Sequence, residues 1–154
     1  MTDSLRLRKH LLGDLAPPTW PASTNPVALS AVDPQALHRI LAAAYTNGFG
    51  SVAPFEAWWT GLTADSEYDP ALVFIAADEA DQPIGVAQCW ISGFVKDVAV
   101  MPAWRGKGIG EALLREAFHV FHGRRLAHVD LKVMRANAPA LALYRRLGMV
   151  EVPL

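Results

Sequence analysis

A cluster of three glycines between a short apolar segment and an amphipathic one limits most strongly how this chain can fold. The preceding segment, residues 95–101, has the length and apolar content of a strand. The following segment places apolar residues at helical spacing from Ile109 until Gly123. The glycines lie within residues 105–110, so the pattern predicts a strand, a tight loop and a helix.

This glycine-rich loop suits the binding of an anion. Glycines let the backbone turn its N–H groups toward one point, where the positive end of the helix dipole also lies. The phosphates of a nucleotide-like cofactor would fit, and a loop whose glycines serve only the turn is the alternative. Two nucleotide motifs do not match: a Rossmann fingerprint needs glycine in place of Glu111, and a Walker A loop needs Ser or Thr after Lys107.

The rest of the chain alternates between the periodicities of strands and helices. Asp33 is suited to cap a helix that has Pro34 at its first position, and Asn47-Gly48 ends it. The resulting element order, β, α, α, β, β, β, α, β, α, β, predicts a mixed α/β sheet with helices on its faces. Further strands are expected at residues 27–30, 72–77, 84–91, 127–133 and 149–152, and further helices at 55–62 and about 138–147, the three strands from 72 to 101 forming an antiparallel meander.

The first 25 residues differ from the remainder and are interpreted as an extension of one domain that covers residues 26–154. Leu5, Leu7 and Leu11 partly alternate with polar residues, which predicts an edge strand, and a proline-rich extended arm follows. The segment after Met149 is too short for a long last strand. Because proteins seldom leave strand edges bare, we expect either a homodimer formed by self-pairing or an N-terminal strand that covers the gap.

Composition excludes several classes of protein. A chain of 154 residues is the size of one domain, and 14 Lys and Arg against 15 Asp and Glu leave no basic excess for nucleic acid or an anionic membrane. The single Cys89 cannot form an internal disulfide or a cysteine zinc site, and the histidines offer no i,i+4 pair, so no metal is expected. With no signal-peptide pattern and no run of 18 apolar residues, we expect a soluble cytoplasmic protein.

Two segments together resemble the GNAT superfamily of N-acetyltransferases. Arg105, Gly108 and Gly110 fill the family's pyrophosphate-loop pattern, Gln/Arg-x-x-Gly-x-Gly/Ala, and residues 97–102 resemble its fourth strand. Residues 137–149 resemble the second signature, Asn-x-x-Ala-x-x-Leu-Tyr followed by Gly and an aromatic residue, which here is Met149. The resemblance covers roughly residues 27–152 and implies a mixed, mostly antiparallel sheet flanked by helices and splayed at an acetyl-CoA site.

The resemblance also implies which residues bind acetyl-CoA. The backbone of Val98 and Val100, with Ala99 between them, would pair with the pantetheine arm. Asn137 would hydrogen-bond that arm while it also caps a helix, and Ala140 and Tyr144 belong to the same set. The pyrophosphate would lie on the backbone amides of Arg105, Gly106, Lys107, Gly108, Ile109 and Gly110.

Two residues are candidates for catalysis. In the family the tyrosine equivalent to Tyr144 protonates the leaving thiolate, a role that suits a phenol with a pKa near 10; a ring that only packs is the alternative. An amine acceptor arrives as ammonium and must lose a proton, for which Asp97 is the first candidate base. A hydrogen-bonded structural carboxylate is the alternative interpretation of Asp97.

Other side chains are weaker candidates. Glu56 is a second possible base, whereas His119 and His122 are expected on the solvated face of a helix. Four aromatic residues would either wall the acceptor pocket or belong to the core, namely Tyr45, Phe49, Trp90 and Phe94.

We therefore expect an N-acetyltransferase that moves acetyl from acetyl-CoA to a primary amine by direct attack, without a covalent enzyme intermediate. The amine would belong to a small molecule or a protein. The alternatives are a non-catalytic acyl-CoA sensor and a partner protein that has kept only the fold.

Overall fold

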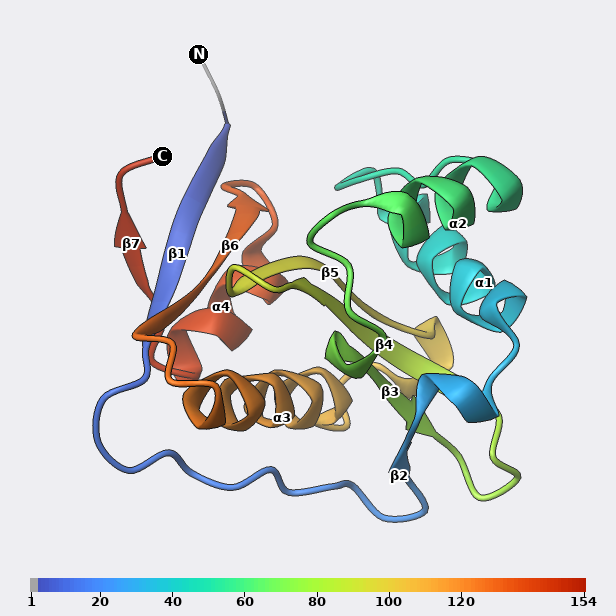
Figure 1. The fold of residues 1–154 in the computed structure, drawn as a ribbon, viewed down its shortest axis with the longest axis horizontal. Coiled ribbons are helices and arrows are strands. Elements are labelled where there is room, and N and C mark those ends of the chain that lie inside the picture. The colour runs from blue at the N-terminus through green and yellow to red at the C-terminus, as the bar shows by residue number, and fades with distance from the viewer. Residues whose placement is uncertain (1–2) are drawn as a thin grey trace.

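A seven-stranded sheet with the order β2-β3-β4-β5-β6-β1-β7 organises the computed structural model, which describes residues 3–154 (Figure 1). Neighbouring strands are antiparallel except β5 and β6, which are parallel. The mixed, mostly antiparallel sheet that the sequence predicted is confirmed. Its strands are β1 (Ser4–His10), β2 (Asn25–Val27), β3 (Val73–Ala77), β4 (Pro83–Trp90), β5 (Phe94–Val100), β6 (His128–Met134) and β7 (Val150–Val152).

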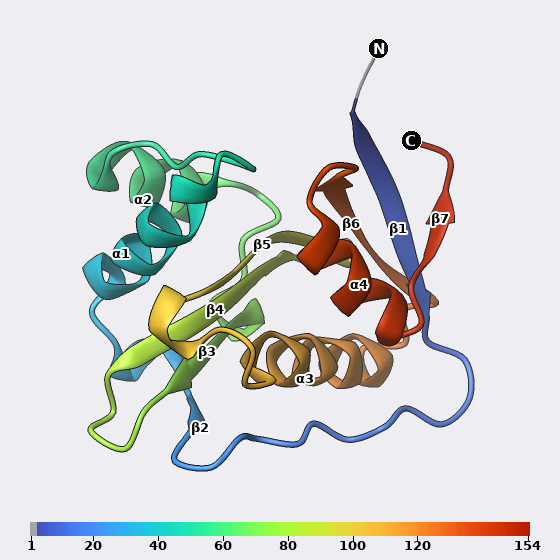
Figure 2. The same cartoon turned by 180° about the vertical axis from the view of Figure 1, so that it is seen from behind.

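Four helices cover the two faces of this sheet, as Figures 1 and 2 show from opposite sides. They are α1 (Pro34–Ala44), α2 (Phe55–Ala64), α3 (Ile109–Gly123) and α4 (Ala138–Arg146). Asp33 caps α1 by accepting a hydrogen bond from the backbone N–H of Gln35, as the sequence predicted. No helix formed by residues 3–154 combines the length and the apolar composition that a membrane crossing requires.

Apolar clusters on both faces join the helices to the sheet. On one face, α1 and α2 pack on β3, β4 and β5 through residues such as Leu37, Leu41 and Val86. On the other, α3 and α4 pack on β6 and β1, with Phe118 and Phe121 almost fully buried. The strand expected at residues 27–30 ends earlier, at Val27, and a 3₁₀ turn follows at Leu29–Ala31. Residues 28–30 therefore leave the sheet instead of extending it.

The N-terminal strand is not the edge strand that the sequence predicted. β1 lies between β6 and β7 and is antiparallel to both, so it is an interior strand of the sheet. It covers the gap beside the short β7, which was one of the two arrangements expected. Leu5 and Leu7 point into the core with α3 and α4, which explains why leucine alternates with arginine here.

The arginines of β1 hold a buried carboxylate on the neighbouring strand. Asp130 of β6 is 2% exposed, and its two oxygens lie 2.7 Å from Arg6 Nε and 2.8 Å from Arg8 Nε. Burial by itself would raise the pKa of Asp130, but the hydrogen bonds from Arg8 and Arg6 outweigh it and lower that pKa. These contacts fix β1 against β6 on the face opposite α3 and α4.

We predict that Leu7→Ala destabilises the whole domain, because Leu7 is 1% exposed in the core that β1 shares with α3 and α4. The expected loss in the free energy of unfolding is about 2 to 5 kcal/mol, the range for a buried leucine. Leu12→Ala is the matched control, since Leu12 is 84% exposed. Chemical denaturation of both variants measures this, and equal stabilities would show that β1 does not contribute to the core.

Candidate functional site

The site begins where β5 and β6 separate. Their parallel register consists of Phe94↔Asp130 and Val95↔Leu131, and β5 continues to Val100 paired only with β4. A strand with a free edge presents backbone donors and acceptors to any extended chain beside it. The divergence therefore creates a place where an extended ligand can pair with β5.

A β-bulge lies at the point of separation. Asp97 of β5 is opposite Gln88 of β4, whereas Val95 is opposite Cys89, so Lys96 is an extra residue without a partner on β4. Bulges bend a strand and change the direction of side chains, and they are frequent beside active sites. No residue pattern in 94–100 indicated this bulge, because a single extra residue leaves the strand's composition unchanged.

A cleft of about 720 Å³ runs along this free edge. Its walls come from β5, from the loop before α3, from the start of α3 and from α4. The cleft brings together every predicted cofactor-binding residue except Lys107, which is exposed and does not line it. Those lining residues are Val98, Ala99, Val100, Arg105, Gly106, Gly108, Ile109, Gly110, Asn137, Ala140 and Tyr144.

The glycine-rich loop has the backbone conformation that anion binding needs. Gly106 and Gly108 have φ values of +75° and +91°, in the left-handed region that residues with a Cβ disfavour. Gly108 is the N-cap of α3 and offers no side chain to the first turn, so the N–H groups there remain open toward the cleft. The loop thus combines open donors with the positive end of the dipole of α3.

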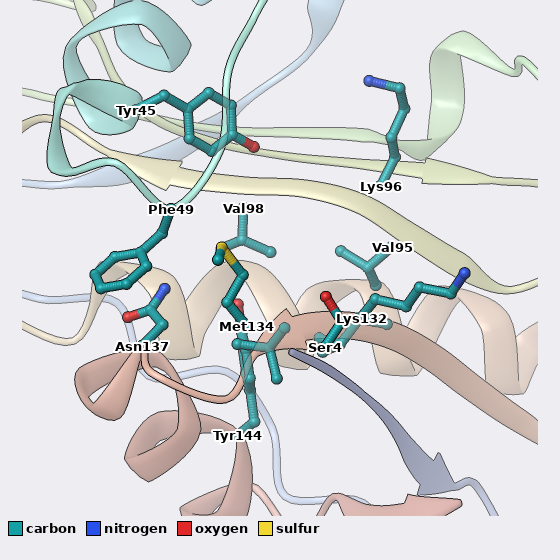
Figure 3. Close-up of a pocket in the computed structure, with 12 residues that line it drawn as sticks. Ser4, Tyr45, Phe49, Val95, Lys96, Val98, Lys132, Met134, Asn137 and Tyr144 are labelled. Atoms are coloured by element: carbon teal, nitrogen blue, oxygen red, sulfur yellow. The ribbon is translucent and has the colours of Figure 1, made fainter. Parts of the chain in front are cut away.

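A second cavity, of about 250 Å³, continues from the cleft (Figure 3). The two share five residues, namely Tyr45, Phe49, Val98, Asn137 and Tyr144. The remaining lining comes mainly from β5 and β6, including Lys96, Lys132 and Met134. The shared residues therefore mark the junction between two spaces, the larger reaching the glycine-rich loop and the smaller reaching the separating strands.

Tyr144 and Asn137 stand at this junction on the same helix, seven residues apart. Tyr144 is 9% exposed, and burial raises its pKa to about 12, so its hydroxyl holds its proton across the physiological range. Asn137 caps α4, with its Oδ1 accepting from the N–H of Ala140 at 3.4 Å. The amide nitrogen of Asn137 makes no hydrogen bond within residues 3–154 and is available to a ligand in either space.

Asp97 does not itself line the junction and is connected to it through a hydrogen bond with Tyr45. The hydroxyl of Tyr45 donates a hydrogen bond to Asp97 Oδ1, and Lys96 Nζ lies 2.9 Å from Oδ2. Burial, followed by the negative charge of Asp97 and this hydrogen bond, raises the pKa of Tyr45. Asp97 is 11% exposed at its side chain and lines neither space, whereas Tyr45 lines both. Sequence reasoning placed Tyr45 in a wall or the core and missed this pair.

The weaker candidates lie away from both spaces. Glu56 is an exposed residue in the first turn of α2, and His122 is exposed in the last turn of α3. His119 donates from Nε2 to the carbonyl of Ala16 at 3.0 Å, which holds the N-terminal arm against α3. None of these three residues lines the cleft or the cavity.

Of the four aromatic candidates, two meet the site. Tyr45 and Phe49 line both spaces, whereas Trp90 packs in the core beneath α1 and α2. The guanidinium carbon of Arg6 lies over the ring of Phe94, 5.4 Å from the centroid of that ring. Across residues 3–154, no group of three or more His, Cys, Asp or Glu side chains is arranged to hold a metal ion.

This chain belongs to the acetyltransferase (GNAT) family, which it matches over residues 35–149. The resemblance seen in its sequence is thereby confirmed. A streptothricin acetyltransferase of Streptomyces lavendulae is 44% identical over 54 residues, 35% of this chain and 29% of that protein. A mycothiol acetyltransferase of Clavibacter michiganensis is 38% identical over 86 residues, 54% of this chain and 28% of that protein.

The fold has a counterpart among solved structures. The crystal structure of a GCN5-related N-acetyltransferase from Sphaerobacter thermophilus matches with a TM-score of 0.80 and 26% identity, covering 97% of this chain and 48% of that chain. This chain therefore spans about half of that crystallised chain and less than a third of the two curated relatives.

We predict that Gly108→Val weakens the binding of CoA at least tenfold, which corresponds to about 1.4 kcal/mol. A branched side chain at a φ of +91° strains the loop and stands where the open N–H groups face the cleft. Gly13→Val is the matched control, because Gly13 has a φ of +85° but lies in the N-terminal arm, outside the cleft. Isothermal titration with CoA distinguishes them, and equal dissociation constants for the two folded variants would reject the loop as the phosphate site.

Proposed function

We propose that this chain is an acetyl-CoA-dependent N-acetyltransferase that transfers the acetyl group to a primary amine by direct attack. One observation carries the proposal: the cleft lined by the family's cofactor signature opens, at Tyr144, into a second cavity. A site with two connected spaces suits a reaction between two substrates that must meet at one atom.

The residues of the cleft fit acetyl-CoA. The open N–H groups of the loop would hold the pyrophosphate, and the free edge of β5 at Val98–Val100 would pair with the pantetheine arm. A Cβ built at Gly108 would meet only Pro21, at 3.8 Å, so the space in front of this glycine remains open to a ligand. Acetyl-CoA supplies the activated acetyl group when bound.

The proton of the incoming ammonium would leave through Tyr45 and Asp97. Tyr45 lines the acceptor cavity and already donates its hydroxyl proton toward Asp97 Oδ1. As the amine gives a proton to the Tyr45 oxygen, the Tyr45 proton passes to Asp97, so Asp97 is the base and Tyr45 the relay. The amine nitrogen then bonds to the acetyl carbon.

Tyr144 would complete the transfer at the other side of the junction. The bond between carbon and sulfur breaks, and the leaving thiolate takes the hydroxyl proton of Tyr144. With its pKa raised to about 12 by burial, Tyr144 carries that proton throughout the physiological range. The nitrogen bonded to the acetyl carbon still carries one proton more than a neutral amide, and it gives that proton to the Tyr144 oxygen. Exchange with solvent afterwards removes the proton on Asp97.

We further propose a cytoplasmic location, in keeping with Cys89, which is buried and free as in proteins of reducing compartments. A homodimer stays a prediction from the sequence. If it forms by strand pairing, β7 and β2 are the available edge strands, because β1 is paired on both sides.

The proposed function is tested by Tyr144→Phe, which removes one hydroxyl and keeps the ring. We expect the parent to release free thiol from acetyl-CoA when an accepted amine is present, and the variant to do so about 10² to 10⁴ times more slowly with CoA affinity nearly unchanged. Below about pH 10, deprotonation of Tyr144 should not lower the kcat/KM of the parent. The protonated hydroxyl that the reaction requires is lost only as the pH rises through the raised pKa of Tyr144.

Tyr68→Phe is the matched control, because Tyr68 packs against Trp59 and lines neither space. Near-parental turnover by Tyr144→Phe would remove Tyr144 from the catalytic residues. Tight CoA binding by the parent without turnover of any amine would favour an acyl-CoA sensor.

We predict that Asp97→Asn and Tyr45→Phe each slow turnover by about tenfold or more, and that the double variant is no slower than the worse single one. Residues that act as one proton path give non-additive losses. Asp69→Asn is the control, since Asp69 accepts from Ala71 and pairs with Arg124 outside the site. Multiplied losses in the double variant would contradict the relay.

A further inference from the structure

The cavity beyond the junction has an unusual charge for an enzyme that accepts an amine. Two lysines, Lys96 and Lys132, are among the described residues that line it, and neither Asp nor Glu is. A protonated amine is itself a cation and would be repelled by such a lining. The positive charge of this lining therefore limits which groups, besides the amine, the acceptor molecule carries.

The two lysines stand at the start of the separation between β5 and β6. They immediately follow Val95 and Leu131, the last paired residues of the two strands. Figure 3 shows both side chains at the end of the cavity opposite Asn137 and Phe49, which are shared with the cofactor cleft. The lysines thus line the part of the cavity that is farther from the glycine-rich loop.

Only one of these two charges is neutralised. Lys96 forms an ion pair with Asp97 at 2.9 Å, whereas Lys132 has no ion pair or hydrogen bond within residues 3–154. Arg6 and Arg8, on the strand next to Lys132, are both occupied by Asp130. Lys132 is the cation at this cavity that remains available to a ligand.

From this placement we infer that the acceptor is a small amine that also carries an anionic group, a carboxylate or a phosphate, and that Lys132 binds that group. The inference rests on the proposed transferase function and specifies its substrate class. Binding the anion at Lys132 offsets the repulsion and leaves the amine toward Tyr45, the relay to Asp97. A nearby cation also favours the neutral form of the amine, which is the form that attacks.

The size of the cavity favours a small molecule. Its volume of about 250 Å³ lies below the roughly 300 to 1,000 Å³ typical of sites for drug-sized ligands. Ser4 of β1 and Met134 of β6, which are opposite each other in the sheet, also line it. An amino acid or an aminoalkyl phosphate has suitable dimensions, and a peptide N-terminus would need space beyond this cavity.

The test compares matched acceptors that differ only in the anion: amino acids against their amides, and aminoalkyl phosphates against the corresponding amino alcohols. We expect the parent to prefer the anionic member of each active pair by about tenfold in kcat/KM, and less at high salt, because Lys132 is exposed. Lys132→Met, which keeps an unbranched four-atom stem but removes the charged amino group, should abolish the preference and leave CoA affinity unchanged. Lys132→Glu should reverse it.

Arg39→Met is the control for loss of one exposed positive charge, because Arg39 lies on α1 outside both spaces. The carboxylate and phosphate pairs distinguish the two kinds of anion. The inference is overturned if amides or a polyamine are acetylated as fast as the acids, if Lys132→Met slows both members of a pair equally, or if an acidic peptide surpasses every small anion.

Failure of the inference is distinguishable from failure of the proposed function. Acetylation of amines without any preference for anions retains the transferase and rejects the role of Lys132. If no amine is acetylated, calorimetric binding of the same matched pairs to the protein with CoA provides the readout. Tighter binding of the anionic members by the parent, lost in Lys132→Met, would support the anion site even then, and equal binding would overturn it.

Discussion

The parallel contact between β5 and β6 lasts for two residue pairs, and both spaces of the site depend on its ending there. Further pairing would close the edge of β5 that borders the cleft and bring together the strands that line the cavity. The separation is possible because each strand has another neighbour. β4 pairs with β5 through the bulge, and β1 pairs with β6 along its whole length and anchors Asp130.

Two carboxylates have contrasting roles on the two sides of this separation. Asp130 accepts hydrogen bonds from two arginines of β1, so both of its oxygens are occupied in holding β1 to β6. Asp97 has one oxygen toward Lys96 and the other toward Tyr45, whose hydroxyl faces the site. Because a buried charge must be paired, each carboxylate requires its partners, yet only the second arrangement connects a charge to the cavity.

The two ends of the site differ in how they recognise a ligand. In the proposed function, the larger cleft would bind acetyl-CoA through backbone groups, namely the N–H groups around Gly108 and the free edge of β5, which depend little on side-chain identity. The smaller cavity would instead bind the acceptor through side chains, with Tyr45, Lys96 and Lys132 giving it polarity and charge. Acceptor preference can therefore change by substitution in the cavity while the cofactor cleft keeps its geometry.

The sequence alone predicted most of the residues that line the larger cleft, because its elements are local. The glycine-rich loop joins consecutive elements, and Asn137 and Tyr144 share one helix, so spacing along the chain fixes their geometry. Only the tertiary structure decided the interior place of β1, the contact of Tyr45 with Asp97 and the position of Lys96 and Lys132 at one cavity. The physical reason is that periodicity tells which face of a strand is buried, whereas the neighbouring strand is selected by packing between segments distant in sequence.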